Sequence, residues 1–274
     1  MEYDPTPYKE FFEKDFTYVN AFWRNASRYS RRPALTDPGT SEVWTYGDLA
    51  ARVRSVATGL VRSGVAPGDV VAYQLYNGPE FAILYLATQA IGAVGSPINF
   101  RLAAGETAYI LGRSAPKVFV YDTSLNQMIT ETFARDTGRP HLIVGVGETD
   151  PVECEGSRTV RWSELAVEPA SLPDPGRTVW DETTRLYTSG TTGMPKAVPM
   201  NSMIEIFSAH DVIMQFPLGP DDITLNMTPW FHRGGLYSGG PNPTFYVGGQ
   251  VIPMRVFDAA ETLDLVEKYG VTFL

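Results

Sequence analysis

The sequence predicts an α/β fold with mostly parallel sheets and helices on both faces. Apolar, strand-like segments alternate along the chain with segments whose apolar residues recur at helical spacing, and short connections rich in Gly and Pro separate them. This alternation is typical of right-handed βαβ units. Residues 70–75 carry no charge and show no polar alternation, which is the pattern of a strand covered on both faces.

Capping signals and spacing define the elements of the first half of the chain. Thr45 and Asp48 have the spacing of a capping box, and apolar residues from Leu49 to Leu60 then recur on one helical face until Gly64 ends the helix. The other predicted helices are 80–91, 104–113 and 125–136, and the predicted strands are 42–46, 70–75, 93–98, 117–121 and 141–146.

The second half begins with a Pro-rich and acidic stretch, residues 148–182, which we predict to be an excursion over the surface. Asp258 is predicted to cap a helix that runs to Lys268. Another helix is expected near 203–214, and strands are expected at 183–188, 223–227, 244–247, 250–252 and 271–274. Because the chain stops within an apolar, strand-like segment, we expect it to be truncated.

Composition excludes several functional classes. The 274 residues include 22 Lys and Arg against 31 Asp and Glu, a net charge of −9, so no nucleic-acid partner is expected. A single cysteine, Cys154, allows no internal disulfide and no Cys-rich zinc site. The charged N-terminus is unlike a signal sequence, and the uncharged runs 81–100 and 234–254 contain too much Gly and Pro to span a membrane. We therefore expect a cytoplasmic protein.

Residues 186–196, Leu-Tyr-Thr-Ser-Gly-Thr-Thr-Gly-Met-Pro-Lys, are the most informative segment. Glycines let consecutive backbone N–H groups face an anion, hydroxyls donate to phosphate oxygens, and the lysine adds a positive charge. We interpret the segment as a polyphosphate-binding loop rather than an ordinary surface turn, although it lacks the Gly-Lys-Ser/Thr ending of a Walker loop. The candidate nucleotide-binding residues are Thr188, Ser189, Gly190, Thr191, Thr192, Gly193 and Lys196.

Residues 187–196 resemble the signature phosphate loop of the adenylate-forming superfamily, which includes acyl-CoA synthetases, adenylation domains of peptide synthetases, and luciferases. Residues 229–235 (Pro-Trp-Phe-His-Arg-Gly-Gly) are similar to the next motif of that superfamily, and residues 46–49 and 98–102 are similar to two earlier ones. The resemblance covers residues 15–274 in the expected order. It implies the fold of the large domain of these enzymes, most like that of an acyl-CoA synthetase.

The resemblance also implies a reaction in two steps. A carboxylate attacks the α-phosphorus of ATP, which gives an acyl-adenylate and pyrophosphate, and a thiol then takes the acyl group. The implied cofactors are ATP, Mg²⁺ and coenzyme A, and no metal ligand is expected from the protein. Lys196 and His232 are the implied catalytic residues. The substrate pocket is expected to include Trp230, His232, Gly234 and Gly235.

Each of these pocket residues has a structural alternative. His232 could be a partly buried side chain satisfied by the backbone, and Trp230 could be a packing residue. The glycines around position 235 could allow close helix packing instead of forming a substrate tunnel. Arg101 is expected to form an ion pair at the end of a strand rather than to act in catalysis.

We expect three regions: residues 1–50 pack on the second subdomain, residues 51–197 form the first α/β subdomain with the phosphate loop, and residues 198–274 begin the second subdomain. Later motifs of the superfamily are not found in the sequence, so this chain by itself is expected to be inactive. The expected partner is a small carboxylic acid, with coenzyme A or an acyl carrier protein as the acceptor. A remnant that only binds remains the alternative outside enzymology. The sequence predicts neither the acid nor the oligomeric state.

Overall fold

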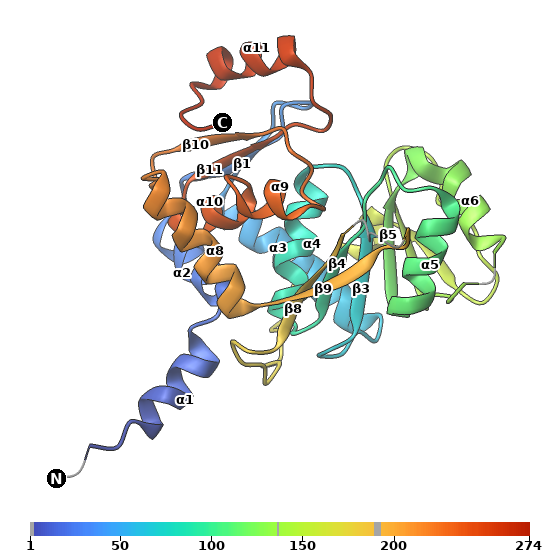
Figure 1. Cartoon of the computed structure of the whole chain (residues 1–274), viewed down its shortest axis with the longest axis horizontal. Coiled ribbons are helices and arrows are strands. Elements are labelled where there is room, and N and C mark those ends of the chain that lie inside the picture. Colours follow the sequence, from blue (N-terminus) through green and yellow to red (C-terminus); the bar gives the residue numbers. More distant parts are fainter. Residues whose placement is uncertain (1–2, 136, 189–192) are drawn as a thin grey trace.

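The computed structural model describes residues 3–135, 137–188 and 193–274. Within this part of the chain, the strands form two sheets that are separated by helices (Figure 1). One buried core joins both sheets to the helices between them, and smaller cores lie on the outer face of each sheet. The architecture is therefore layered, and the sequence prediction of an α/β fold with mostly parallel sheets is confirmed.

The larger sheet has the strand order β7-β6-β5-β3-β4-β8-β9 among the described residues. All neighbouring pairs are parallel except β8 and β9, which are antiparallel. The chain leaves β3 for β4 on one side and then returns to β5 on the other, so the strand order reverses at β3. The strands are β3 (Val70–Gln74), β4 (Val94–Pro97), β5 (Val118–Asp122), β6 (Leu142–Val146), β7 (Arg158–Arg161), β8 (Glu182–Thr188) and β9 (Lys196–Asn201).

Helices cover both faces of this sheet, as predicted. Val71 and Val120 point into the core shared with α3 (Tyr46–Arg62) and α4 (Pro79–Ala90). Ala72 and Phe119, which are the immediate neighbours of these residues on the same strands, point to α5 (Ala104–Ser114) and α6 (Asn126–Phe133) on the opposite face. Side chains alternate between the two faces of a strand. Because helices cover both faces, both sets of positions are apolar, and the strands carry no charged face.

The smaller sheet combines strands from the two ends of the chain. In the order β10-β11-β1-β2, β1 (Pro33–Thr36) pairs in parallel with β11 (Gln250–Pro253) and antiparallel with β2 (Val43–Thr45). On the far side of β11 lies β10 (Ile223–Asn226), which is also parallel to it. The expected boundaries at residues 50 and 197 fall inside α3 and β9, and the division into three regions stays a prediction.

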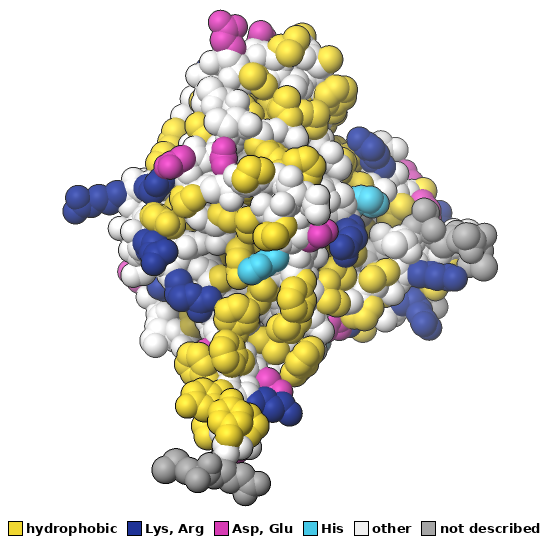
Figure 2. All heavy atoms as spheres, turned by 60° about the vertical axis from the view of Figure 1, so that its left-hand side comes forward, with side chains coloured by type: hydrophobic (Ala, Val, Ile, Leu, Met, Phe, Trp, Pro, Cys, Tyr) yellow, Lys and Arg dark blue, Asp and Glu magenta, His cyan; other side chains and the backbone are white. Residues whose placement is uncertain are grey.

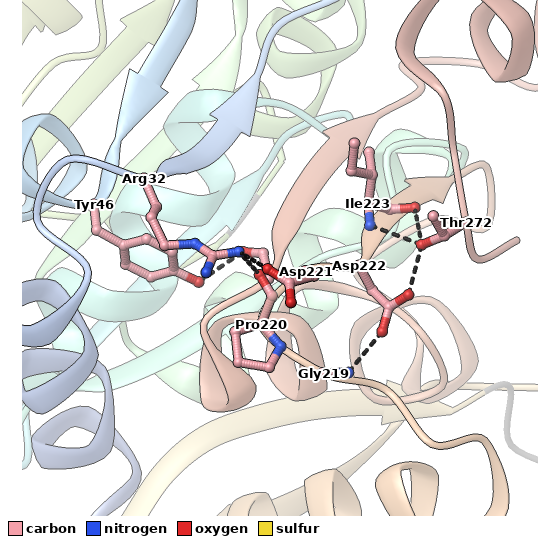
Figure 3. Close-up of polar contacts among 9 residues, drawn as sticks. Arg32, Tyr46, Gly219, Pro220, Asp221, Asp222, Ile223 and Thr272 are labelled. Atoms are coloured by element: carbon pink, nitrogen blue, oxygen red, sulfur yellow. Dashed lines mark hydrogen bonds and ion pairs between the residues drawn. The ribbon is translucent and has the colours of Figure 1, made fainter.

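Polar contacts fix the turn that enters β10 (Figure 3). Arg32 donates to the carbonyl of Pro220 and to Asp221 Oδ1. Asp222 accepts hydrogen bonds from Gly219 N and Thr272 Oγ1, both at 2.7 Å. These contacts tie residues near position 32 and residues near position 272 to the same turn, although about 240 positions separate them.

The remaining helices cover the smaller sheet or leave the body. Leu265 of α11 packs on the outer face of this sheet, while Phe22 of α2 and Phe245 of α10 belong to the shared core on its inner face. In Figure 1, α1 projects from the body. These helices are α1 (Thr6–Asp15), α2 (Tyr18–Arg28), α8 (Ser202–Gln215), α9 (Arg233–Tyr237), α10 (Pro241–Val247) and α11 (Ala259–Tyr269). By contrast, α7 (Trp162–Leu165) contacts β6 and β7 of the larger sheet, and the 3₁₀ turn η1 (Thr123–Leu125) directly follows β5.

Two predicted caps are confirmed. Asp48 N donates to Thr45 Oγ1 at 3.1 Å while Thr45 N donates to Asp48 Oδ2 at 3.0 Å, which is the reciprocal pattern of a capping box. Asp258 Oδ1 accepts from Glu261 N at 2.9 Å and starts α11. Within the described residues, the search for helices that are apolar and long enough to cross a bilayer finds none.

Several element predictions were wrong or incomplete. The strand predicted at 271–274 is only a single bridge between Phe273 and Thr224, and α1, α2, β1 and α9 were not predicted. Residues 244–247 belong to the helix α10, not to a strand, because Pro241 starts this helix where an N–H is not needed and Gly248 ends it in the left-handed conformation. The surface excursion 148–182 contains β7 and α7. The strand β9 was missed because it contains Pro199, which an edge strand tolerates.

Candidate active site

The segment predicted to bind polyphosphate connects β8 to β9 at the carboxyl edge of the larger sheet. Thr188 ends β8 and Lys196 begins β9, and the two residues are paired across the hairpin. Ligands of open α/β sheets bind at this edge. Four of the residues predicted to bind the nucleotide lie outside the described residues: Ser189, Gly190, Thr191 and Thr192.

The described flanks of this loop face solvent. The side chains of Thr188 and Lys196 are exposed, and Pro195 is buried beneath them. Gly193 has a φ of +90°, and a Cβ built on it would meet nothing within 4 Å. The position therefore calls for glycine because of its backbone conformation rather than crowding, and it leaves open space on this side of the loop.

His232 is the N-cap of α9. Its Nδ1 accepts a hydrogen bond from Gly234 N at 3.1 Å, and the side chain is exposed. An accepting Nδ1 places the proton of the neutral imidazole on Nε2. His232 is thus both partly satisfied by the backbone, as the structural alternative supposed, and able to present an N–H donor to a ligand.

Trp230 is fully buried, which favours its alternative as a packing residue. Its backbone N donates to Asn77 Oδ1 at 2.8 Å, and its indole Nε1 donates to Asn226 Oδ1 at 3.2 Å. The ring packs edge-on against Phe81. Asn77 Nδ2 also donates to Thr228 O at 3.0 Å, so the loop after β3 positions the segment that carries His232.

The glycines around position 235 allow close contact between backbones. A Cβ on Gly235 would overlap the carbonyl of Pro229, and a Cβ on Gly240 would overlap the carbonyl of Gly235. The chain therefore folds on itself with no room for a side chain at these two points. Gly234 is less restricted, because its nearest neighbour would be His232 Nδ1 at 3.3 Å. For Gly235, this geometry supports close packing rather than a tunnel.

This packing predicts that Gly235→Ala destabilises the chain. The added methyl group must displace the backbone at Pro229, and overpacking of this kind costs about 1–3 kcal/mol. Urea unfolding of the 274-residue chain measures the change. Gly219→Ala is the matched control, because the atom nearest to its added Cβ would be Asp222 Oδ2 at 3.7 Å, which is an ordinary van der Waals contact. Equal stability of the two variants would contradict the packing role.

A row of aromatic and cationic side chains, which we call the aromatic ladder, lies along the carboxyl edge of the larger sheet. We did not predict that these residues act together. Phe231 packs edge-on against Phe100, whose ring centroid lies 4.2 Å from that of Tyr76. The Arg255 guanidinium lies over the Tyr76 ring and pairs with Asp122 at 2.9 Å. The ladder joins the loops after β3, β4 and β11 and the last residue of β5 to Phe231, the residue that precedes His232.

Arg101 is not in an ion pair within the described part of the chain, contrary to the expectation. It is exposed and lies over the Phe100 ring, 5.2 Å from the centroid. Since β4 and β8 are neighbours, the loop after β4 and the phosphate loop leave the same edge.

A cavity of about 530 Å³ opens beside this ladder. Its walls include Tyr76, Glu80, Asp122 and Arg255, together with Asp37 from the loop after β1. Burial raises the pKa of the Glu80 carboxyl, and the nearby Asp37 and Asp122 charges act in the same direction. The carboxyl edges of both sheets thus meet around one hollow with mixed charge.

A fully buried carboxylate, Glu205, lies at the base of the phosphate-loop hairpin. Thr183 Oγ1 and Thr184 Oγ1 each donate to Glu205 Oε1 at 2.7 Å. The Tyr85 hydroxyl and the Asn242 amide both donate to Oε2. Glu205 on α8 therefore joins β8, α4 and α10, and this arrangement could not be predicted because a lone Glu in a helix is usually exposed.

Stability should depend on pH through Glu205. Burial raises its pKa above the ordinary value of 4.5, so the folded chain binds this proton more tightly than the unfolded chain does. The stability that protonation provides is complete below pH 4.5 and is lost as the pH rises toward the raised pKa.

Glu205→Gln removes this titration. The stability of the wild type relative to Glu205→Gln should therefore fall as the pH rises above the ordinary value of 4.5 toward the raised pKa, which urea unfolding of both chains measures. A difference that is independent of pH would contradict the raised pKa. Other titrating groups are common to both chains and cancel.

The predicted site residues are only partly connected. Among residues 3–135, 137–188 and 193–274, no hydrogen bond or ion pair joins Lys196 to His232. In the same described ranges, no three His, Cys, Asp or Glu side chains form a group that could hold a metal ion. The aromatic ladder reaches the His232 segment through Phe231, and the predicted phosphate loop leaves the same sheet edge because β4 and β8 are neighbours.

The chain is similar in sequence to proteins named as CoA ligases, a CoA synthase and fatty acid transport proteins. Long-chain fatty acid transport protein 1 of Rattus norvegicus is 30% identical over 262 residues, which are 93% of this chain and 40% of that protein. For 4-coumarate–CoA ligase 3 of Oryza sativa subsp. japonica, the identity is 32% over 88% of this chain and 42% of the relative. Feruloyl-CoA synthase of Amycolatopsis sp. is 32% identical over 251 residues, which are 92% of this chain and 46% of that protein. The chain spans less than half the length of these relatives.

Solved structures agree with the fold. A long-chain-fatty-acid CoA ligase from Rhodopseudomonas palustris superimposes with a TM-score of 0.83 at 28% identity, over 94% of this chain and 62% of that one. The N-terminal domain of FACL13 from Mycobacterium tuberculosis gives a TM-score of 0.78 at 26% identity, over 93% and 61% of the two chains. The family described as AMP-binding enzyme matches residues 22–274. The chain belongs to the AMP-binding enzyme family, whose relatives here include acyl-CoA ligases.

Proposed function

We propose that a protein containing this chain uses MgATP to convert a carboxylic acid into an acyl-adenylate and then into a thioester of coenzyme A. The observation that carries the proposal is the hairpin between β8 and β9, which presents Thr188, Gly193 and Lys196 at the carboxyl edge of a parallel sheet. Membership of the AMP-binding family supports it. The names of the relatives, several of which are CoA ligases, favour coenzyme A over a carrier protein as the acceptor.

In the first step, the carboxylate oxygen forms a bond to the α-phosphorus while the bond to pyrophosphate breaks. The role of Lys196 is to stabilise the charge that develops on the departing phosphates, together with the hydroxyl of Thr188. A fixed positive charge at a developing anion is among the larger contributions to catalysis. The exposure of both side chains and the open space at Gly193 suit a ligand as large as a triphosphate.

His232 has a different role in this proposal. Its Nδ1 is occupied by Gly234 N, so Nε2–H is the donor that faces outward. Such a donor can hold the attacking carboxylate beside the α-phosphate without taking part in proton transfer. The cap thereby fixes both the ring orientation and the tautomer.

In the second step, the thiol sulfur of coenzyme A attacks the acyl carbon. The C–O bond to AMP breaks, so the products are the thioester, AMP and one proton. In this proposal Mg²⁺ would enter with ATP, bound by the phosphates, and would offset their negative charge during the attack. We place this chemistry in the cytoplasm, since the one cysteine, Cys154, gives no sign of an oxidising compartment.

The test is acid-dependent exchange of labelled pyrophosphate into ATP, measured with the natural-length protein and a panel of acids. The panel takes its classes from the names of the relatives: long-chain fatty, hydroxycinnamic and sulfonated acids. Exchange with at least one acid, followed by thioester formation with coenzyme A, is the expected result. If a thioester formed only on a holo-carrier protein, the acceptor would be that protein and not coenzyme A. If no acid supported exchange, the result would favour a protein that only binds.

A further inference from the structure

Asn77 is a buried side chain that connects the two parts of the candidate site. It lies in the loop between β3 and α4, and only 6% of its surface is exposed. Its Oδ1 accepts a hydrogen bond from Trp230 N at 2.8 Å, and its Nδ2 donates to Thr228 O at 3.0 Å and to Asn226 O at 3.4 Å. One side-chain amide therefore pairs with a donor and two acceptors of the same backbone segment, much as a neighbouring strand would. We call these three hydrogen bonds the Asn77 clamp.

The Asn77 clamp joins the sheet that carries the predicted phosphate loop to the segment that carries His232. Among the hydrogen bonds within residues 3–135, 137–188 and 193–274, only those of Asn77 connect residues 70–201 to residues 226–232. Two aromatic contacts, from Trp230 and Phe231, connect the same parts. Aromatic pairs tolerate centroid distances of about 4.5–7 Å, whereas N–H···O bonds are confined to about 2.7–3.2 Å. The clamp is therefore the contact that fixes the position of this segment.

The clamp acts close to His232 and at a favourable place in the sheet. The strand order reverses at β3, and only β4 separates β3 from β8, at whose end the predicted phosphate loop begins. Ligands of open α/β sheets bind at such a reversal. His232 follows Trp230 by two residues, and His232 N donates to Pro229 O at 3.2 Å. A shift of the clamped backbone therefore moves His232 with it.

We propose that Asn77 is a positioning residue, which holds residues 226–232 so that the Nε2–H of His232 lies in a fixed place at the carboxyl edge of the larger sheet. Asn77 does not touch the reacting atoms, and its effect passes through His232. The inference rests on the proposed acid activation, in which this N–H holds the attacking carboxylate. Because a displacement of about 1 Å can cost about 100-fold in rate, loss of the clamp should impair use of the acid rather than binding of ATP.

A double-mutant cycle on acid-dependent pyrophosphate exchange in the natural-length protein tests this role. Asn77→Ala should lower the rate by about 10–100-fold and raise the KM for the acid, while the KM for ATP stays within about twofold. In a His232→Ala background, the same change should lower the rate by less than about twofold, because the residue through which Asn77 acts is already missing. An equal fall in both backgrounds would overturn the inference, since a general effect on the fold does not depend on His232.

The two KM values of Asn77→Ala decide the outcome if His232→Ala leaves no measurable exchange. A rise for the acid alone supports the inference, and an equal rise for ATP overturns it. If His232→Ala exchanges as fast as the wild type, the inference is wrong while acid activation stands. If the wild type shows no exchange with any acid, the proposed function fails and the inference fails with it.

Two further variants separate positioning from folding. Asn77→Asp keeps the shape of the side chain and the acceptor for Trp230 N but loses the donor to Thr228 O, so it should fold and show a smaller loss with the same dependence on His232. Asn25→Ala is the matched control, because Asn25 Nδ2 also donates to two backbone carbonyls, at 2.9 and 2.7 Å, but on α10. It should change exchange by less than about twofold in either background. A loss that depends on His232 for Asn25→Ala as well would overturn the specific role of Asn77.

Discussion

Lys196→Ala should lower acid-dependent pyrophosphate exchange by about 100-fold in the natural-length protein. The side chain is exposed at the start of β9 and supplies the positive charge of the loop that we propose to hold the departing phosphates. Removing one group that stabilises a developing anion typically costs 10²–10³-fold in rate. The folded state should be unaffected, because an exposed lysine contributes little to stability.

Two controls make this result specific. Lys268→Ala removes an equally exposed lysine on α11, whose Nζ contacts Ser41 Oγ, and should leave exchange unchanged. Lys196→Arg keeps the charge but changes its geometry, so it should restore part of the rate. Full activity of Lys196→Ala would show that the loop does not act on the phosphates and would favour a protein that only binds.

Glu205→Ala should destabilise the 274-residue chain by about 3–5 kcal/mol. Truncation leaves a cavity and removes one acceptor of Thr183, Thr184, Tyr85 and Asn242, all of which donate to this carboxylate from other elements. Thr183 and Asn242 keep other acceptors, whereas Thr184 and Tyr85 lose the acceptor that the structure gives them. Each buried donor without a partner carries a desolvation cost. At about 2–4 °C for each kcal/mol, the melting temperature should fall by about 10 °C.

Glu182→Ala is the matched control at the start of β8. Glu182 forms a two-pronged ion pair with Arg185, at 2.6 and 2.7 Å, but both side chains keep more than a fifth of their surface exposed. Partly exposed pairs contribute about 0–1 kcal/mol. The melting temperatures of the two variants, measured by calorimetry, should therefore differ clearly. If Glu205→Ala had the same melting temperature as the wild type, the buried hydrogen bonds of Glu205 would not stabilise the hairpin.

Local patterns were sufficient to predict most of the larger sheet. The capping box at Thr45 and Asp48 forms because both partners lie within one turn, and the uncharged run over β3 is buried on both faces. The prediction failed where local and tertiary signals differ. Residues 244–247 look extended in the sequence, yet Pro241 and Gly248 delimit a helix that packs into the shared core.

The candidate site was predictable only in part. Lys196 and His232 were found through motifs, since a phosphate loop concentrates its chemistry in a few consecutive residues. The ladder through Tyr76, Phe100 and Arg255 was not found, because its members follow different strands and meet only at the sheet edge. Whether Trp230 lines a pocket or packs in the core was also decided only by the structure, in which it is fully buried.

The sequence by itself determined the class of fold and predicted a phosphate-binding role for one loop, because periodicity, capping and clusters of hydroxyl groups act between residues that are close along the chain. Only the tertiary structure decided which polar groups are buried and which apolar ones are exposed. Glu205 is enclosed by donors from three other elements, while hydrophobic side chains of α1 are left in solvent on the projecting end of the molecule (Figure 2). Both outcomes depend on contacts between distant segments, and a linear pattern does not specify which segments will meet.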